Sequence, residues 1–274
     1  AVTTKPRRIR LDQLLVDRGL APNRSRAQAL VLAGKVRVGA GDAARRDKSA
    51  GDLVDPAVPV QVDADPEYVS RGAHKLIAAL DAFEIDPAGK IGLDVGASTG
   101  GFTDVLLRRG ARRVYAVDVG RGQLAETLRR DERVSSLERT NARDLSRELI
   151  PEPVDVAVVD VAFISLGLVL GPILSVLAPG ASIVALVKPQ FEAGRADAPA
   201  GVVQDREVHR RVLAQVTGRA RELGLGTRGV IPSRLRGPEG NREFLAWFGR
   251  GPSCAELEAR IEEAVDRAWR EPGR

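Results

Sequence analysis

Short apolar runs alternate with longer amphipathic stretches from about residue 85 to the end of the chain. Runs that are apolar at every position are typical of strands buried on both faces, and apolar residues at helical spacing are typical of helices between them. We predict strands at residues 91–95, 114–117, 154–159, 182–187, 228–231 and 243–248. Helices should fill most of the gaps, which indicates an α/β fold with a mostly parallel sheet.

Two helices are predicted around this core. Residues 71–83 place Leu76, Ala79, Leu80 and Phe83 on one face, and residues 255–269 repeat apolar positions every four residues. The stretch 161–187 has no charged residue and is long enough to suggest a membrane span. Several glycines and prolines interrupt it, so we predict a strand end, a helix, a turn and a second buried strand instead.

The first 65 residues follow a different pattern. Leu11, Leu14 and Leu15 share a face of a short helix within residues 9–20, and Ser25 is a candidate cap for a second helix that ends at Gly34. Strand-like alternation follows in residues 35–39, and residues 41–65 suggest small strands and turns. We therefore predict a small α+β domain at 1–65, a linker at 66–70 and the α/β domain at 71–274.

Charge strengthens this division. Residues 1–60 hold twelve Lys and Arg against six Asp and Glu, while the whole chain has a net charge of +5. The basic segment indicates either a polyanion-binding module or a solvated basic arm. Its candidate RNA-binding residues are Arg7, Arg8, Arg10, Arg24, Arg26, Lys35 and Arg37.

The cysteine and histidine content argues against a disulfide-bonded protein and against a zinc protein. Cys254 is the only cysteine, so no intramolecular disulfide forms, and a reducing cytoplasm fits. His74 and His209 are far apart in the chain and make no convincing zinc site with one cysteine, so we expect no metal. The polar first residues show no secretory signal, which also favours a cytoplasmic protein without a membrane partner.

A glycine turn follows the first predicted strand. Gly96, Gly100 and Gly101 have the spacing G-x-x-x-G-G, which is neither the dinucleotide fingerprint nor a phosphate loop. The turn suits a ligand without a pyrophosphate, and Asp94 could reach a charged amine on it. A tight turn with a purely structural role is the alternative.

The next predicted strand adds a second acidic residue. Asp118 ends that strand, 22 residues after Gly96, where a carboxylate can accept hydrogen bonds from both hydroxyls of a ribose. Asn141 and Ala142 lie where the next strand or loop would meet an adenine. Together these features resemble the class I methyltransferase fold, a Rossmann-like, mostly parallel seven-stranded sheet whose cofactor is S-adenosylmethionine. The resemblance implies cofactor contacts from Asp94, Gly96, Ala97, Ser98, Gly100, Gly101, Phe102, Asp118, Asn141, Ala142 and Asp160.

The residues after the later strands indicate the type of acceptor. Asp160 stands where base methyltransferases often carry a Pro-Pro motif, and Cys254 lies outside the expected site. Lys188 ends a buried strand in a chain with six lysines and thirty-six arginines, and a lysine can accept a proton where an arginine cannot. The set Lys75, Asp160, Lys188 and Glu243 resembles the catalytic tetrad of FtsJ-type ribose 2′-O-methyltransferases. The alternative is that these four residues form ordinary ion pairs at strand ends without a catalytic role.

Longer motifs narrow the resemblance. The segments SRGAHKL, DVGASTGGFTDVLLRRGA, LERTNAR, FISL, LVKPQFE and GPEGNREFL are similar to TlyA-type ribosomal RNA methyltransferases, sometimes labelled hemolysin A. Residues 9–65 resemble the S-four-type RNA-binding domain. The resemblance implies methylation of the 2′-oxygen of cytidine ribose in ribosomal RNA, with ribosomal RNA or ribosomal subunits as partners. Longer family members modify both subunits, and this chain resembles the longer kind.

The sequence departs from the family pattern at two places, and two other functions remain as alternatives. Ala162 stands where we expect a serine, and the linker carries Pro66 and Tyr68 in a different setting from its relatives. The hemolysin label suggests a cytolysin, although no amphipathic membrane-seeking segment is visible. A non-catalytic RNA-binding protein on a methyltransferase scaffold is the third possibility.

Overall fold

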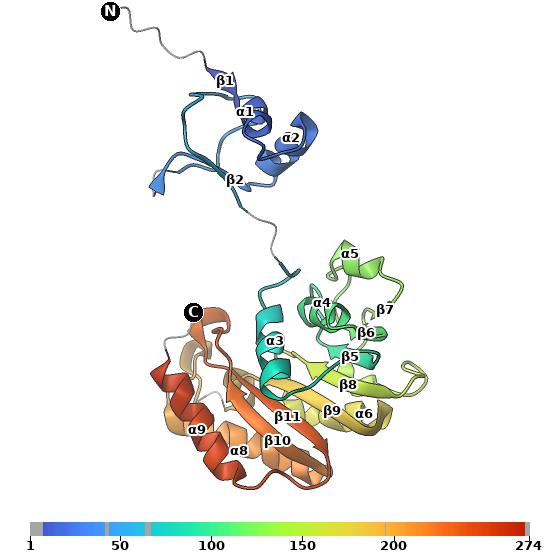
Figure 1. The fold of residues 1–274 in the computed structure, drawn as a ribbon. Helices are drawn as coiled ribbons and strands as arrows, with labels where there is room; N and C mark the ends of the chain where they lie inside the picture. Colours follow the sequence, from blue (N-terminus) through green and yellow to red (C-terminus); the bar gives the residue numbers. More distant parts are fainter. Residues whose placement is uncertain (1–7, 42–43, 64–66, 195, 272–274) are drawn as a thin grey trace, which may run out of the picture. The chain divides into compact units, whose positions relative to one another are not determined.

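The computed structural model describes residues 8–41, 44–63, 67–194 and 196–271, and the chain divides into two compact units between Glu67 and Tyr68 (Figure 1). The smaller unit contains β1 (Ile9–Arg10), α1 (Leu11–Asp17), α2 (Arg24–Leu32), β2 (Val36–Val38), β3 (Leu53–Val54) and β4 (Val60–Val62). β1 pairs with β3 and β2 with β4, both antiparallel. Ten buried apolar residues form one core between the two helices and these strands.

The start of α2 differs from the prediction. The helix begins at Arg24, so Ser25 lies inside it and Asn23 is the cap, with its side-chain oxygen accepting a hydrogen bond from the Arg26 amide at 2.9 Å. Asparagine and serine cap helices equally well, so the position of the turn decided which of them is used. Gly34 follows the helix with φ +66, a conformation that favours glycine.

The larger unit is built on a seven-stranded sheet in the order β10-β11-β9-β8-β5-β6-β7. Its strands are β5 (Ile91–Val95), β6 (Arg113–Val117), β7 (Val134–Leu137), β8 (Val154–Val159), β9 (Leu177–Val187), β10 (Leu225–Pro232) and β11 (Phe244–Arg250). β11 runs antiparallel to both of its neighbours, β9 and β10, and the other pairs are parallel. The predicted α/β class with a mostly parallel sheet is confirmed.

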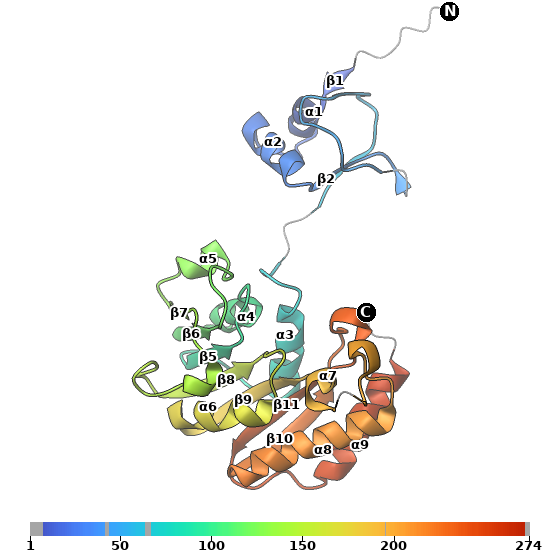
Figure 2. The same ribbon diagram turned by 180° about the vertical axis from the view of Figure 1, so that it is seen from behind.

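Helices cover both faces of this sheet (Figure 1, Figure 2). α3 (Ala73–Ala82), α4 (Gly101–Arg108) and α5 (Glu126–Arg129) pack against one face, with Leu106 and Val158 in their shared core. α6 (Leu170–Val176), α8 (Arg206–Glu222) and α9 (Leu257–Arg270) pack against the other face, with Leu93 and Phe244 in theirs. α7 (Pro189–Glu192) and the short turns Ala142–Asp144, Leu166–Leu168, Pro199–Gly201 and Pro238–Gly240 lie between these elements.

The uncharged stretch 161–187 contains a helix and a buried strand, as predicted, but it begins with a loop instead of a strand end, and β9 starts directly after α6 without the predicted turn. It contains a loop, the turn Leu166–Leu168, α6 and β9. Among the helices of the described residues, none has the length and apolar character needed to cross a membrane. The strand β7 was missed by the prediction because Ser135 and Ser136 interrupt its apolar pattern.

Candidate active site

Five ionisable residues meet at one edge of the sheet. Asp94 lies near the end of β5, whereas Asp118, Asp160 and Lys188 follow directly after β6, β8 and β9. Glu243 directly precedes β11, whose first pair with β9 is Phe244 with Val187. Because β11 is antiparallel to the others, its start lies at the same edge as their carboxyl ends. This edge is where α/β sheets bind their ligands.

The same five side chains also belong to one face of the sheet. Along a strand, successive side chains point to opposite faces. Ala116, Val158, Leu186 and Leu245 all pack in the core under α3 and α4. Each stands two positions from Asp118, Asp160, Lys188 or Glu243, which therefore continue that face at the edge.

The glycine turn at the end of β5 is required by close packing. Gly96 has φ +84, and a Cβ there would overlap the Asp160 carbonyl oxygen. Gly100 has φ +95, and a Cβ there would overlap the Leu124 and Leu128 side chains. Both positions therefore need glycine for conformation and for space. Of the other predicted turn residues, Ala97 and Phe102 are buried in the core under α4, whereas Ser98 is exposed and has φ +48.

Asp94 has an unused acceptor atom at this turn. It is fully buried, and its Oδ2 accepts hydrogen bonds from the amide and the hydroxyl of Thr103 at 2.8 and 2.7 Å. Its Oδ1 is buried and has no hydrogen-bond partner among the described residues. Burial raises the pKa of Asp94 to about 7, and the charge of Asp160 raises it as well, against the Thr103 hydrogen bonds. A buried carboxylate with an open oxygen suits a cationic ligand group.

This pKa gives a test. If Asp94 holds the ammonium group of S-adenosylmethionine, affinity should be full above pH 7 and fall by up to about tenfold per unit below it, since a protonated carboxyl must lose its proton on binding. Calorimetry between pH 5.5 and 8 measures this dependence. The Asp94→Asn variant should bind weakly with no such slope. A flat profile in the unsubstituted protein would remove Asp94 from the cofactor site.

Asp118 holds together the rim of a small hollow. Its Oδ2 accepts from the Ser98 amide at 2.8 Å and its Oδ1 from the Gly120 amide at 2.7 Å. The hollow is lined by Ala97, Ser98, Ala116, Asp118, Gly120, Gln123, Leu124, Ser136 and Glu138. Asn141 instead caps the turn Ala142–Asp144 by accepting from the Arg143 amide, and Ala142 packs against the opposite core. Gln123 and Glu138 are candidates that the sequence reasoning missed.

Replacing Asp118 should affect the cofactor more than the fold. Asp118→Ala should weaken S-adenosylmethionine binding by about 1–3 kcal/mol, the scale of a lost hydrogen bond to a charged group. Calorimetry checks the affinity, and Asp81→Ala is a matched control because Asp81 lies on the exposed side of α3 and pairs with Arg109. Equal affinities for the two variants would place the ribose elsewhere.

The four residues of the predicted tetrad form two ion pairs. Lys188 Nζ lies 2.6 Å from Asp160 Oδ1, and Lys75 Nζ lies 2.5 Å from Glu243 Oε2. Lys75 comes from α3, whereas the other three come from strand ends. The exposed side-chain fractions are 15% and 27% for Lys188 and Asp160, against 11% and 0% for Lys75 and Glu243. The Asp160 carboxylate of the first pair is therefore open to a substrate, whereas the Glu243 carboxylate of the second pair is buried.

The loop between β10 and β11 closes over Glu243. A Cβ at Gly237 would overlap Oε1 of Glu243, so only glycine fits there. Asn241, which is 2% exposed, accepts from the Val203 amide at 3.1 Å and donates to the Gly201 carbonyl at 2.8 Å. It ties this loop to the segment that follows α7. The sequence reasoning quoted this motif and did not assign Asn241 a role.

An exposed aromatic side chain lies beside the open ion pair. Phe163 is 90% exposed and has φ +62, and its ring centroid lies 4.8 Å from that of Phe191. Lys188 Nζ lies 5.9 Å from the centroid of Phe191. An exposed aromatic ring can stack against a planar ligand group. Phe163 belongs to the quoted motif FISL, but its exposure cannot be inferred from that motif.

The predicted RNA-binding residues of the smaller unit have several environments. Arg10 and Arg24 both pair with Asp12, which is buried in that unit, and the Arg10 hydrogen bonds hold the pKa of Asp12 well below its usual range. Arg37 pairs with Asp63 at 2.6 Å. Arg8, Arg26 and Lys35 are not buried, and Arg7 lies outside the described residues.

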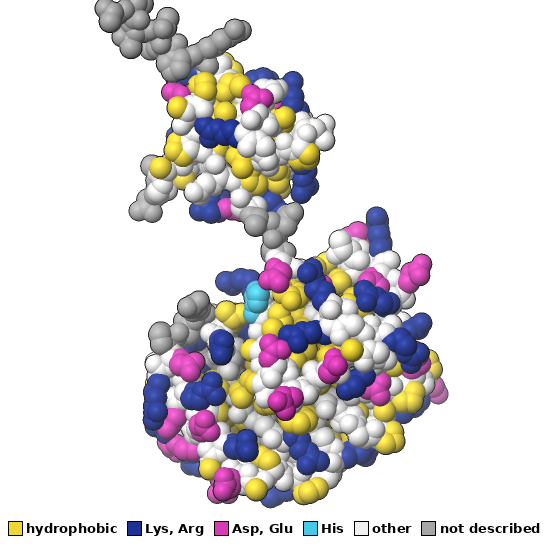
Figure 3. Space-filling view, in the orientation of Figure 1, with side chains coloured by type: hydrophobic (Ala, Val, Ile, Leu, Met, Phe, Trp, Pro, Cys, Tyr) yellow, Lys and Arg dark blue, Asp and Glu magenta, His cyan; other side chains and the backbone are white. Residues whose placement is uncertain are grey.

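The larger unit carries nearly balanced charge, since residues 68–274 hold 30 Lys and Arg against 28 Asp and Glu. On the face of it that Figure 3 shows, basic and acidic side chains are interleaved. No group of three or more His, Cys, Asp or Glu residues in the described part of the chain is placed to hold a metal ion.

Comparison with known proteins settles the family. The FtsJ-like methyltransferase family matches residues 68–250, and the S4 domain matches residues 9–39. The 16S/23S rRNA (cytidine-2′-O)-methyltransferase TlyA of Mycobacterium tuberculosis is 48% identical over 96% of this chain and 97% of its own length. The chain belongs to the TlyA family of FtsJ-like methyltransferases. The family resemblance read from its motifs is thereby confirmed.

Two further relatives carry the hemolysin label. Hemolysin A of Brachyspira hyodysenteriae is 38% identical over 88% of this methyltransferase and 99% of its own length. A solved structure described as a proposed hemolysin from Streptococcus thermophilus is 39% identical, with a TM-score of 0.74, and covers 97% of this chain and 98% of that one. Both labels accompany the same two-domain chain, so they do not indicate a different fold.

Proposed function

We propose that this protein transfers a methyl group from S-adenosylmethionine to the 2′-oxygen of a cytidine ribose in ribosomal RNA. The observation that carries the proposal is the open Lys188–Asp160 ion pair at the sheet edge, next to the glycine turn. The M. tuberculosis relative, named a 16S/23S rRNA (cytidine-2′-O)-methyltransferase, supports the substrate.

The residues at the edge of β5 and β6 fit the cofactor. The unpartnered Oδ1 of Asp94 suits an ammonium group, and the Asp118 carboxylate at the hollow suits ribose hydroxyls. When bound, S-adenosylmethionine supplies an electrophilic methyl group on a sulfonium centre. Asp118 already uses both oxygens for backbone amides, so it is held in one orientation before any ligand arrives.

The residues at the edge of β8 and β9 fit a hydroxyl acceptor. A ribose hydroxyl is a weak nucleophile and must be oriented and lose its proton during the transfer. Lys188 can orient the oxygen and, as the neutral amine, accept this proton, and the Asp160 carboxylate, 2.6 Å from its Nζ, stabilises the ammonium group that forms. The part-buried Lys75–Glu243 pair joins α3 to the start of β11, and Lys75 compensates the charge of the buried Glu243 carboxylate. Positioning is the main task of this site.

RNA recognition is divided between the two units in this proposal. Residues 1–65 form the RNA-binding domain and supply affinity through phosphate contacts, and residues 71–274 carry the chemistry, with residues 66–70 as the linker. The exposed ring of Phe163, which contacts Phe191 near Lys188, suits a base that has left its stack, since RNA proteins often place aromatic rings against unstacked bases.

Mapping of methylated nucleotides tests the function. Ribosomal subunits that have not been modified are incubated with the protein and S-adenosylmethionine, and the RNA is partly cleaved in alkali. A 2′-O-methyl group prevents attack on the neighbouring phosphate, so the modified position should leave a gap in the ladder. A complete ladder, with methyl groups incorporated elsewhere, would contradict the proposed acceptor atom.

A further inference from the structure

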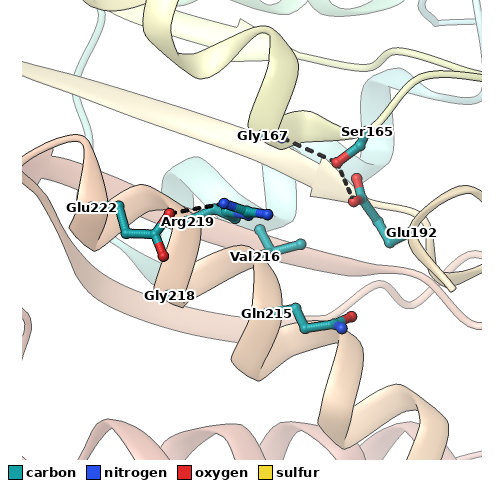
Figure 4. Close-up of a pocket in the computed structure, with 8 residues that line it drawn as sticks. All are labelled: Ser165, Gly167, Glu192, Gln215, Val216, Gly218, Arg219 and Glu222. Carbon is teal, nitrogen blue, oxygen red and sulfur yellow. Dashed lines mark hydrogen bonds and ion pairs between the residues drawn. The ribbon is translucent and has the colours of Figure 1, made fainter.

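A ring contact and hydrogen bonds join the two segments that follow Asp160 and Lys188, in addition to the ion pair between these two residues. The segment 161–168 follows Asp160, and α7 follows Lys188. Phe163 contacts Phe191 between them. Next to this ring contact, the Glu192 carboxylate accepts hydrogen bonds from the Ser165 hydroxyl at 2.7 Å and the Leu166 amide at 2.8 Å. Figure 4 shows Glu192 pointing toward Ser165 at one side of a pocket.

These hydrogen bonds engage both oxygens of the Glu192 carboxylate. Each oxygen of Glu192 accepts one bond, and the Ser165 oxygen in turn accepts from the Gly167 amide at 3.2 Å. Leu166 is 1% exposed, and its amide would lose its hydrogen-bond partner if the carboxylate were removed. Hydrogen bonds to a charged acceptor are stronger than those between neutral groups. The Glu192 carboxylate is therefore the main group that stabilises this turn.

The segment needs such a fastening because part of it is strained. Phe163 has φ +62, a backbone conformation that side-chain-bearing residues rarely adopt, and its ring is mostly in solvent. Strained conformations persist only where surrounding contacts hold them. On the amino-terminal side, the Asp160 amide is held by the Val95 carbonyl at 2.8 Å. On the carboxyl-terminal side, Glu192 supplies the matching hold.

We propose that Glu192 is a positioning residue for the acceptor nucleotide. Its carboxylate keeps residues 161–166 in the strained conformation, so that Phe163 and the Lys188–Asp160 pair form one preformed surface. The residues implied in cofactor binding on β5 and β6 do not contact Glu192. Loss of this carboxylate therefore impairs the use of RNA and leaves cofactor affinity unchanged. The identity of the acceptor rests on the proposed function.

The test compares Glu192→Ala, Glu192→Gln and a control in the full-length protein. Glu192→Ala should raise amide hydrogen exchange in residues 161–168 and lower kcat/KM for ribosomal RNA at least tenfold, with S-adenosylmethionine affinity within twofold. Glu192→Gln should restore most of both, because its amide oxygen accepts from Leu166 and its amide nitrogen can donate to Ser165. Glu222→Ala is the control, since Glu222 lines the same pocket and its side chain pairs with the exposed Arg219.

Three results would overturn the assignment. The first is unchanged exchange in residues 161–168 of Glu192→Ala. The second is a kcat/KM for RNA within twofold of the unsubstituted protein. The third is an activity loss that Glu192→Gln shares in full, or that a parallel loss of cofactor affinity accompanies. An unsubstituted protein without activity on ribosomal RNA would instead refute the proposed function, and the exchange measurement would still decide whether Glu192 holds the segment.

Discussion

Lys188→Ala is expected to lower methyl transfer by about 100- to 10,000-fold, the range that a positioned proton acceptor contributes. S-adenosylmethionine should still bind, because Asp94 and Asp118 belong to other strands. Lys188→Arg should fail almost as severely, since arginine keeps the positive charge next to Asp160 but cannot take up a proton. Single-turnover kinetics with ribosomal RNA, together with calorimetry of cofactor binding, measures both effects.

A lysine outside the site provides the control for this experiment. Lys90→Ala removes another of the six lysines from an exposed position before β5, and it should leave turnover unchanged. An Lys188→Arg variant with near-normal turnover would show that Lys188 orients the hydroxyl and that a different group takes the proton.

Removal of residues 1–65 is expected to have the second large effect. The remaining chain contains the whole of the larger unit, which begins at Tyr68, so its cofactor affinity should be unchanged. Binding to ribosomal RNA should weaken, and the dependence of log affinity on log salt concentration should flatten, since each lost phosphate contact lowers that slope by roughly 0.7–0.9. Filter binding across a salt series measures both quantities.

A subtler variant distinguishes lost contacts from lost fold in that experiment. Arg8 and Arg26 are both exposed, and replacing them with glutamine in the full-length chain should lower the salt slope in the same direction by a smaller amount. If the shortened protein methylates ribosomal RNA at the full rate in moderate salt, the smaller unit serves another purpose.

The arrangement of the main site follows from two regularities of the sequence. Parallel strands end at a common edge, and alternate residues share a face. The carboxyl ends of these strands agree with the prediction to within a few residues, and they place Asp118, Asp160 and Lys188 at one edge of the sheet. Glu243 joins them because β11 runs in the opposite direction, which the pattern of apolar runs alone does not reveal.

Other features depend on contacts between residues far apart in the chain, and the sequence pattern could not predict them. Lys75 and Glu243 pair across 168 positions of the chain. Arg10 and Arg24 were predicted to bind RNA, yet both pair with Asp12, whose burial depends on how α1 packs. Likewise, the exposure of Phe163 depends on the backbone of one turn, which Glu192 holds from another segment.

Analysis of the nucleosides made by the enzyme tests the central claim most directly. Unmodified ribosomal RNA is incubated with the protein and isotopically labelled S-adenosylmethionine, digested to nucleosides and separated by mass spectrometry. We predict a methylated cytidine whose fragmentation places the added mass on the sugar. A labelled nucleoside with the added mass on the base would contradict the role assigned to Lys188 and Asp160.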